Sequence, residues 1–266
     1  VTAHGSGDVV LNADSGTIDV NFAVSSGSGD IDITGDHVSQ DADVTSGGIG
    51  TIELIADNGN VNQAFGVTTS TGSGLITFRA NTLGGNVVFL AGTTTTTGTV
   101  TLNAGDDVTI ATTANVLGGT VAILADTGVA DGGDGASILL FGNITATAGI
   151  TVTGGPDADI IRIDSNGGTE SVLPNILDNA TGTVNNINSD IDIAGGGGSD
   201  YLTLENGSVG AATEFRWSAH GTPAAQSGKL SNNISDTNPF FDLGVDVSYS
   251  GMTVVNINTG TGSDVL

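Results

Sequence analysis

This chain contains three glycine-rich turns, each of which ends in an aspartate. Their residue types and spacing are those of a candidate ligand-binding site. Each turn lies between two short apolar runs, and the three segments align without gaps: 150–163, 191–204 and 255–266. Their aspartates, Asp159, Asp200 and Asp264, are 41 and 64 residues apart. Carboxylates beside turn carbonyls are oxygen ligands, so these turns suggest the binding of a hard cation.

The cores of these segments resemble the calcium-binding nonapeptide Gly-Gly-x-Gly-x-Asp-x-apolar-x of RTX repeat proteins, which residues 195–203 match at every position. The first segment has Asp157 where the pattern has glycine, and the third has Thr259 in place of the first glycine. The resemblance implies Ca²⁺ as the cofactor. The residues that it assigns to metal sites are Asp157, Asp159, Gly195, Gly198, Asp200, Gly262 and Asp264.

The spacing of the turns leaves two arrangements open. In RTX proteins adjacent turns share each ion, because Ca²⁺ takes six to eight oxygen ligands and one turn supplies too few. Insertions at about 167–186 and 205–250 could loop out, so that the three turns stack as successive coils and share ions. Alternatively, each turn is an isolated half-site whose glycines only serve the backbone.

A repeat in the first half of the chain predicts the elements that position these turns. Six strand-like segments follow one another at intervals of 22, 21, 24, 24 and 21 residues, beginning at Asp8, Asp30, Thr51, Leu75, Thr99 and Thr120. A period of about 20 to 25 residues built from strands and turns is typical of a solenoid, in which each coil buries its apolar face against its neighbours.

Each repeat predicts three short strands, because a second apolar run follows the first and a Ser/Thr-rich run closes the coil. Alternating residues such as Ile52, Leu54, Val100 and Leu102 should point inward. We therefore predict an all-β, right-handed parallel β-helix of about 20–24 residues per coil. Residues 1–150 resemble the coils of filamentous-haemagglutinin-type adhesins and autotransporter passenger domains. Residues 151–266 form the RTX-like solenoid with the two insertions.

The charge balance excludes several partners. The 266 residues include 29 acidic and four basic side chains, which gives a formal net charge of −25. A phosphate backbone must be neutralised by Lys and Arg, so we predict no nucleic-acid binding. The chain has no cysteine and no stretch of 18 apolar residues, so we predict neither disulfides nor membrane insertion.

Five of the eleven aromatic residues lie in the second insertion and its flank. They could pack on the side of the solenoid, cap its end or form a contact between protomers. The predicted interface residues are Phe215, Trp217, Phe240, Phe241 and Tyr249.

Enzymatic chemistry is not predicted. Acidic pairs such as Asp30 and Asp32 fall at turns or on outward strand faces, and His4, His37 and His220 have no metal-ligand spacing. The Ser/Thr-rich third strands could instead form a flat hydroxyl face that binds carbohydrate, a partner protein or, less favoured, ice. Exposed strands also favour threonine without any function.

These features together predict a structural, cohesive protein that is secreted or displayed at a bacterial cell surface or in an extracellular matrix. It would be a Ca²⁺-stabilised segment of a large adhesin, surface layer or filament. Its expected partners are other copies or neighbouring repeats of the same protein. The alternative is a carbohydrate- or partner-binding module on a β-helix.

Overall fold

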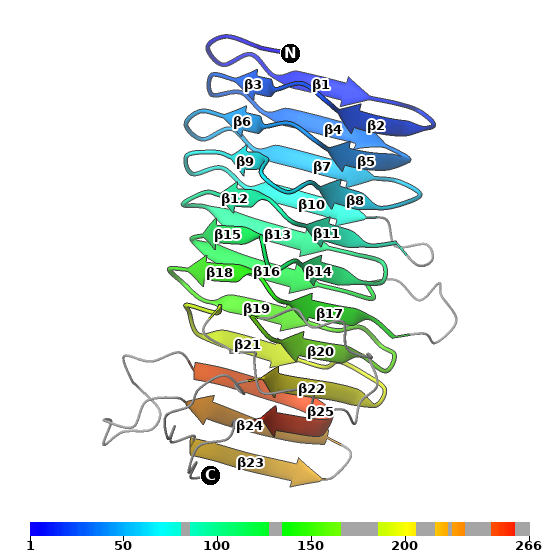
Figure 1. Ribbon diagram of the computed structural model, residues 1–266, viewed down its shortest axis with the longest axis vertical. Coiled ribbons are helices and arrows are strands. Elements are labelled where there is room, and N and C mark those ends of the chain that lie inside the picture. Colours follow the sequence, from blue (N-terminus) through cyan, green and yellow to red (C-terminus); the bar gives the residue numbers. More distant parts are fainter. Residues whose placement is uncertain are drawn as a thin grey trace.

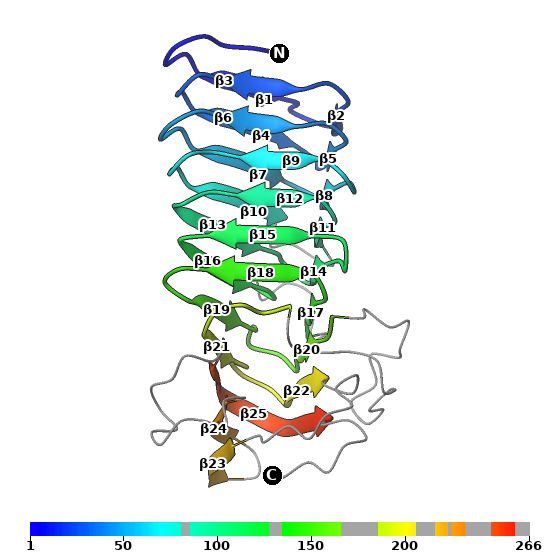
Figure 2. The same cartoon turned by 60° about the vertical axis from the view of Figure 1, so that its left-hand side comes forward.

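A computed structural model shows that the chain winds into a parallel β-helix with three walls, whose coils stack along the long axis (Figures 1 and 2). It describes residues 1–80, 86–127, 135–165, 186–205, 216–222, 225–231 and 246–258. These residues are all-β and contain no helix. The predicted fold class is therefore confirmed.

The first wall takes one strand from each coil, and neighbours pair in parallel. The six segments of the sequence repeat each supply one of its strands. In stacking order the strands are β1 (Val9–Asn12), β4 (Ile31–Gly35), β7 (Ile52–Ala56), β10 (Ile76–Ala80), β13 (Thr99–Asn103), β16 (Thr120–Leu124), β19 (Ile150–Thr153), β21 (Ile191–Ala194) and the first part of β25 (Asp246–Asn258).

The second wall follows the first around each coil and is also parallel. Its strands are β2 (Thr17–Val20), β5 (His37–Gln40), β8 (Val61–Gln63), β11 (Val88–Leu90), β14 (Val108–Ile110), β17 (Ser137–Leu140), β20 (Ile160–Ile163), β22 (Asp200–Glu205) and the last part of β25.

The third wall is a separate six-stranded parallel sheet built from the Ser/Thr-rich runs. Its strands are β3 (Val24–Ser26), β6 (Val44–Ser46), β9 (Thr68–Ser70), β12 (Thr93–Thr95), β15 (Asn115–Gly118) and β18 (Asn143–Ala146). It ends earlier than the other walls: beyond β18, an isolated parallel bridge joins Ile144 to Ile187.

One continuous apolar core fills the space between the walls. Residues alternate inward and outward along each strand, and inward residues stack on their counterparts one coil away. Ile52, Leu54, Val100 and Leu102 are all fully buried, as predicted. Burying one such side chain contributes about 1.5 to 3 kcal/mol. The core is thus a stack of nearly equivalent apolar layers.

Several hydroxyls of the Ser/Thr-rich runs face inward rather than outward. Thr71 and Thr96 each donate from Oγ1 to a glycine carbonyl in the preceding coil, Gly50 and Gly74, at 2.7 Å. Ser26 and Ser46 make the same bond two coils earlier, to Gly7 at 2.7 Å and Gly29 at 2.8 Å. The Ser/Thr-rich run therefore has a structural use, because it ties each coil to the previous one.

A buried polar network interrupts the apolar core where the second wall meets the third. Gln63 is fully buried, donates to Thr69 Oγ1 at 2.9 Å and to Thr94 Oγ1 at 3.3 Å, and accepts from the Gly92 N–H at 3.1 Å. In the next coil the same position is the apolar Leu90. The network belongs to these coils and not to the fold as a whole.

Replacing Gln63 by leucine is expected to lower the free energy of unfolding by about 1 to 3 kcal/mol. The substitution leaves the Gly92 N–H and the Thr94 hydroxyl buried without this partner, which costs more than the apolar side chain gains. Chemical denaturation measures the change. Leu90→Met, at the equivalent position one coil away, serves as the control and should change stability less. Equal stabilities would contradict the role of the network.

The C-terminal end is built differently from the rest. Strand β25 pairs with β21 in the first wall and with β22 in the second, passing the corner at Gly251, whose φ is +78°. Part of the second predicted insertion is strand rather than loop. Strands β23 (Arg216–Thr222) and β24 (Ala225–Ser231) form an antiparallel hairpin, and β24 pairs with β25 (Figure 1). The hairpin thereby covers the edge of β25.

Candidate functional site

The first two aspartate turns stack on each other, although their aspartates are 41 residues apart in the sequence. Strand β19 pairs with β21 and β20 with β22, so the turns between them occupy the same corner of successive coils. Asp159 and Asp200 close these turns at the start of the second wall. Of the two arrangements that the sequence left open, the structure has the stacked one for these two turns.

Backbone N–H groups surround the Asp159 carboxylate, which is fully buried. Its Oδ1 accepts a hydrogen bond from the Ala136 N–H at 2.8 Å, and its Oδ2 accepts one from the Gly155 N–H at 2.8 Å. The Asp159 N–H in turn donates to Asp200 Oδ1 at 2.9 Å. These bonds join three coils at one corner, so the aspartates act first as ties between coils.

The position of the carboxylates explains the first glycine of each turn. A Cβ on Gly154 would lie 2.0 Å from Asp159 Oδ2, and a Cβ on Gly195 would lie 2.3 Å from Asp200 Oδ2. Any side chain there would displace the carboxylate. The glycine pattern of the motif is therefore required by packing at this corner, whether or not an ion binds.

A third carboxylate, which the motif did not reveal, lies at the same corner one coil closer to the N-terminus than Asp159. Asp126 follows β16 at the same corner and is buried, with a backbone φ of +48° that non-glycine residues seldom adopt. Its Oδ2 accepts from the Asp157 N–H at 3.3 Å. The sequence signal was an aspartate just after a predicted first-wall strand. We call Asp126, Asp159 and Asp200 the aspartate column.

Burial changes the acidity of this column. Desolvation raises the pKa of Asp159 to about 7, and the charges of Asp200 and Asp126 act in the same direction, while the bonds from Ala136 and Gly155 oppose the rise. Burial likewise raises the pKa of Asp200 above its ordinary value. Asp159 thus exchanges its proton near neutral pH, unlike an exposed carboxyl group.

The strand that precedes the third predicted turn lies in a different wall from the one expected. Val255, which aligns with Ile191 in the sequence, pairs with Leu202 in the second wall, and Met252 stacks on Asp200. The three segments share a sequence pattern because their strands alternate apolar and polar residues. They do not all occupy the same position in a coil. Gly262 and Asp264 lie outside the described residues.

Among the described residues, no group of three or more His, Asp or Glu side chains is arranged to hold a metal ion. Both oxygens of Asp159 already accept N–H bonds, so its surroundings present positive rather than negative dipole ends to an incoming cation. Asp157 is partly exposed and belongs to the same turn. Gly195 lies against the Asp200 carboxylate, and Gly198 lies against the Asp157 carbonyl. Asp200 Oδ2 is buried without a hydrogen-bond partner. Calcium binding stays a prediction of the motif.

Searches for related proteins leave the chain without an assigned family. No family model, curated protein or solved structure matches it. No helix in the described part of the chain has the length and hydropathy to cross a bilayer.

Of the predicted interface residues, only Tyr249 has a described side chain. It is 3% exposed and stacks on Ile193 in the first wall, which places it in the core rather than on a contact surface. Trp217 lies in β23, where the backbone pairing alone is described. Phe215, Phe240 and Phe241 lie outside the described residues.

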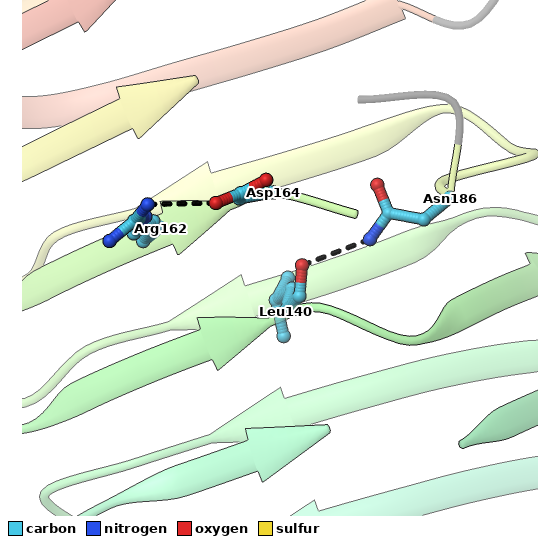
Figure 3. Close-up of polar contacts among 4 residues, drawn as sticks. All are labelled: Leu140, Arg162, Asp164 and Asn186. Atoms are coloured by element: carbon cyan, nitrogen blue, oxygen red, sulfur yellow. Dashed lines mark hydrogen bonds and ion pairs between the residues drawn. The ribbon is translucent and has the colours of Figure 1, made fainter. Parts of the chain in front are cut away.

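Further buried polar side chains lie near the second wall, at strand β20, in the same coil as Asp159. Arg162 donates to Asp164 Oδ2 at 2.7 Å (Figure 3). Its guanidinium lies 5.8 Å from the centre of the Phe141 ring. Asn186 donates from Nδ2 to the carbonyls of Leu140 at 2.9 Å and Gly142 at 3.0 Å. These bonds anchor the chain where the third wall ends.

The outer face of the third wall carries a shallow groove of about 280 Å³. Leu117 lies between Thr95 and Thr145 on neighbouring strands, and Thr97 and Thr147 flank the adjacent turn. The predicted hydroxyl face is therefore real only in part, because Thr69, Thr71, Thr94 and Thr96 are buried.

Stability is expected to fall by about 1 kcal/mol as pH rises from 6 to 8.5. Because the pKa of Asp159 is raised in the folded state, the folded protein keeps a proton there that the unfolded chain has already lost. The stabilisation is complete at pH values below the ordinary pKa of an aspartate and disappears as pH passes 7. Thermal melting in low-salt buffers measures it, and Asp159→Asn should flatten the profile. An unchanged slope in that variant would contradict the assignment.

Proposed function

We propose that this chain is a rigid structural segment of an extracellular or cell-surface assembly, with a mechanical rather than catalytic role. The observation that carries the proposal is the single core that runs through every coil from Val9 to Met252. Parallel coils spaced by about 4.8 Å give a stiff rod whose length grows with each repeat.

The N-terminal end supports a role in assembly. Strands β1 and β2 each pair on one side only, with β4 and β5, whereas residues 1–3 cover part of β3. The Val9 and Ala13 N–H groups donate to the Asp30 and Thr34 carbonyls of the next coil, so the alternating N–H groups of Val10 and Asn12 point toward the open side. An unpaired strand edge can pair with another chain. This end is therefore suited to receive a further coil.

The surface charge agrees with an extracellular rod. A net charge of −25 over 266 residues makes rods repel one another sideways, and the repulsion weakens as salt or divalent cations screen it. End-to-end contact through backbone pairing is less affected by this repulsion than side-to-side contact. Cations would then favour assembly without needing a specific site.

Electron microscopy and analytical ultracentrifugation of the purified protein at increasing concentration test this proposal. We expect thin end-to-end particles, and Val10→Pro should reduce them because proline removes the outward N–H without breaking an internal bond. Val10→Thr, which keeps that N–H, is the matched control, and thermal melting checks that both variants fold. Particles that form equally in both variants, or no particles in the unaltered protein, would contradict assembly through this edge.

The proposed structural role does not require calcium. Calcium binding is tested separately on the same purified protein. Melting is compared in EDTA and in Ca²⁺, with Mg²⁺ as the control for general charge screening. A rise in melting temperature specific to Ca²⁺ would support the calcium prediction. An equal effect of both ions would support screening alone.

A second candidate function is the binding of a carbohydrate or partner protein in the groove of the third wall. The observation that favours it is the apolar Leu117 between Thr95 and Thr145, which places methyl and hydroxyl groups side by side in the groove. A glycan array tests it with Leu117→Arg, and with Thr77→Arg on the outer face of the first wall as the control. If Leu117→Arg abolishes glycan binding on the array and Thr77→Arg does not, the result would support this function.

A further inference from the structure

We propose that Asn58 is a site of spontaneous deamidation in the folded protein, and that its conversion to an acid weakens the corner joining the first three coils. The reaction needs only water. The Gly59 nitrogen loses its proton and attacks the Asn58 side-chain carbonyl, and ammonia leaves as a succinimide forms. Water then opens the ring to aspartate or isoaspartate.

Packing fixes the glycine that makes this asparagine reactive. The His37 ring lies against Gly59, where a Cβ would be 1.9 Å from the nearest ring atom. The ring is held in place because His37 Nδ1 accepts a hydrogen bond from the Asn60 N–H at 3.1 Å. Any larger residue at position 59 would clash with this ring. The absence of a side chain there leaves the attacking nitrogen unhindered.

The Asn58 side chain is exposed, and the Gly59 N–H makes no hydrogen bond within the described part of the chain. Water can therefore reach the Asn58 side-chain carbonyl. By contrast, the N–H groups of Asp57, Asn58 and Asn60 each donate to one acceptor. The Gly59 nitrogen therefore attacks without first losing a hydrogen bond of its own, and the bond that breaks is the one from the Asn58 amide to Asp36.

Deamidation of Asn58 affects the contacts between coils because Asn58 binds Asp36. Its Oδ1 accepts from Asn58 Nδ2 at 2.6 Å, and its Oδ2 accepts from the Gly16 N–H at 2.7 Å, so this carboxylate ties three successive coils. These bonds, with that from Asn58 as the larger cause, lower the pKa of Asp36, which stays charged. An acid at position 58 removes the donor and places a second negative charge beside the first.

Peptide mapping by mass spectrometry tests the modification. The folded protein is incubated at pH 8 and 37 °C, and fragmentation locates a gain of about 1 Da at each asparagine. We expect Asn58 to convert, giving both aspartate and isoaspartate, while Asn62 in the same coil does not, because Gln63 follows it. A parallel sample in urea measures the unfolded rate. Asn58 that converts in urea but stays intact in the folded protein would overturn the proposal.

Two variants test the structural consequence. Asn58→Asp imitates one product, and Asn58→Gln, which keeps the amide and deamidates slowly, is its matched control. We expect the aspartate variant to melt about 1 to 3 °C below the glutamine variant in low salt, and the difference to shrink in high salt. Equal melting temperatures in low salt would show that the corner tolerates the second charge and would overturn the second half of the proposal.

Discussion

Replacing Gly74 by alanine is expected to lower the free energy of unfolding by about 3 to 5 kcal/mol, because the new Cβ would meet backbone rather than a movable side chain. It would lie 2.0 Å from the Gly50 carbonyl oxygen and 2.8 Å from the Ile49 carbonyl oxygen. Those atoms belong to the turn of the preceding coil. They can retreat only if the parallel pairing of β7 with β10 is disturbed.

The same turn recurs along the rod, which gives the substitution its large effect. Gly29 lies against the Gly7 carbonyl and Gly50 against the Gly29 carbonyl in the same manner, at 2.3 and 2.2 Å from a built Cβ. The Gly74 carbonyl also accepts the Thr96 hydroxyl of the next coil. A shift at Gly74 therefore reaches the coils on both sides.

Gly7→Ala provides the control for the Gly74 prediction. Gly7 lies in the equivalent turn of the first coil, and a Cβ there would have ordinary contacts of 3.4 and 3.5 Å. Its replacement should change stability by less than about 1 kcal/mol. Chemical denaturation compares both variants with the unaltered protein. Similar stabilities for the two variants would mean that the coils separate more easily than their stacking indicates.

The alternation of apolar residues and the glycine corners were enough to predict the coils. Ile52 and Leu54 point inward because strands alternate faces, and each repeat preserves that alternation. The Ser/Thr-rich run was correctly assigned to the third wall. Its buried threonines were not separated from its exposed ones, because both faces of these short strands carry hydroxyl residues.

The end of the rod could not be predicted from local pattern. The segment at Val255 looks like a first-wall strand followed by a turn, yet β25 has already passed through the first wall. Gly251 lets the chain pass the corner without the six-residue turn seen between Gly154 and Asp159. The wall that a strand joins depends on where the preceding coil ends. The sequence of the strand alone therefore does not predict its wall.

The aspartate motif was recognised in the sequence, but its local chemistry depends on distant residues. Asp159 accepts from Ala136, which is 23 residues away, and its amide donates to Asp200, which is 41 residues away. The first partner has no side-chain signal, because it is the backbone N–H of Ala136. The second is the Asp200 carboxylate, which the motif singles out without stating that it lies one coil from Asp159. A motif can thus predict a turn reliably while leaving the use of its carboxylate undetermined.

Asp159→Ala is the variant that decides what the aspartate column does, and it should destabilise the protein by about 2 to 5 kcal/mol at pH 6. The substitution removes the acceptor of the Ala136 and Gly155 N–H groups, and each buried N–H without a partner costs about 1 to 3 kcal/mol. It also leaves a space at a corner that three coils share. Asp157→Ala, two residues away and partly exposed, should cost less than about 0.5 kcal/mol.

The pH dependence of this loss separates a structural tie from a metal ligand. As pH rises through 7, the unaltered protein loses the stabilisation that the bound proton of Asp159 provides. The difference in stability between it and the alanine variant should therefore narrow by about 1 kcal/mol between pH 6 and 8.5. Denaturation in EDTA at both pH values gives the measurement. If the column instead held a cation, the difference would vanish in EDTA and widen at high pH when Ca²⁺ is present, because a metal binds the ionised carboxylate.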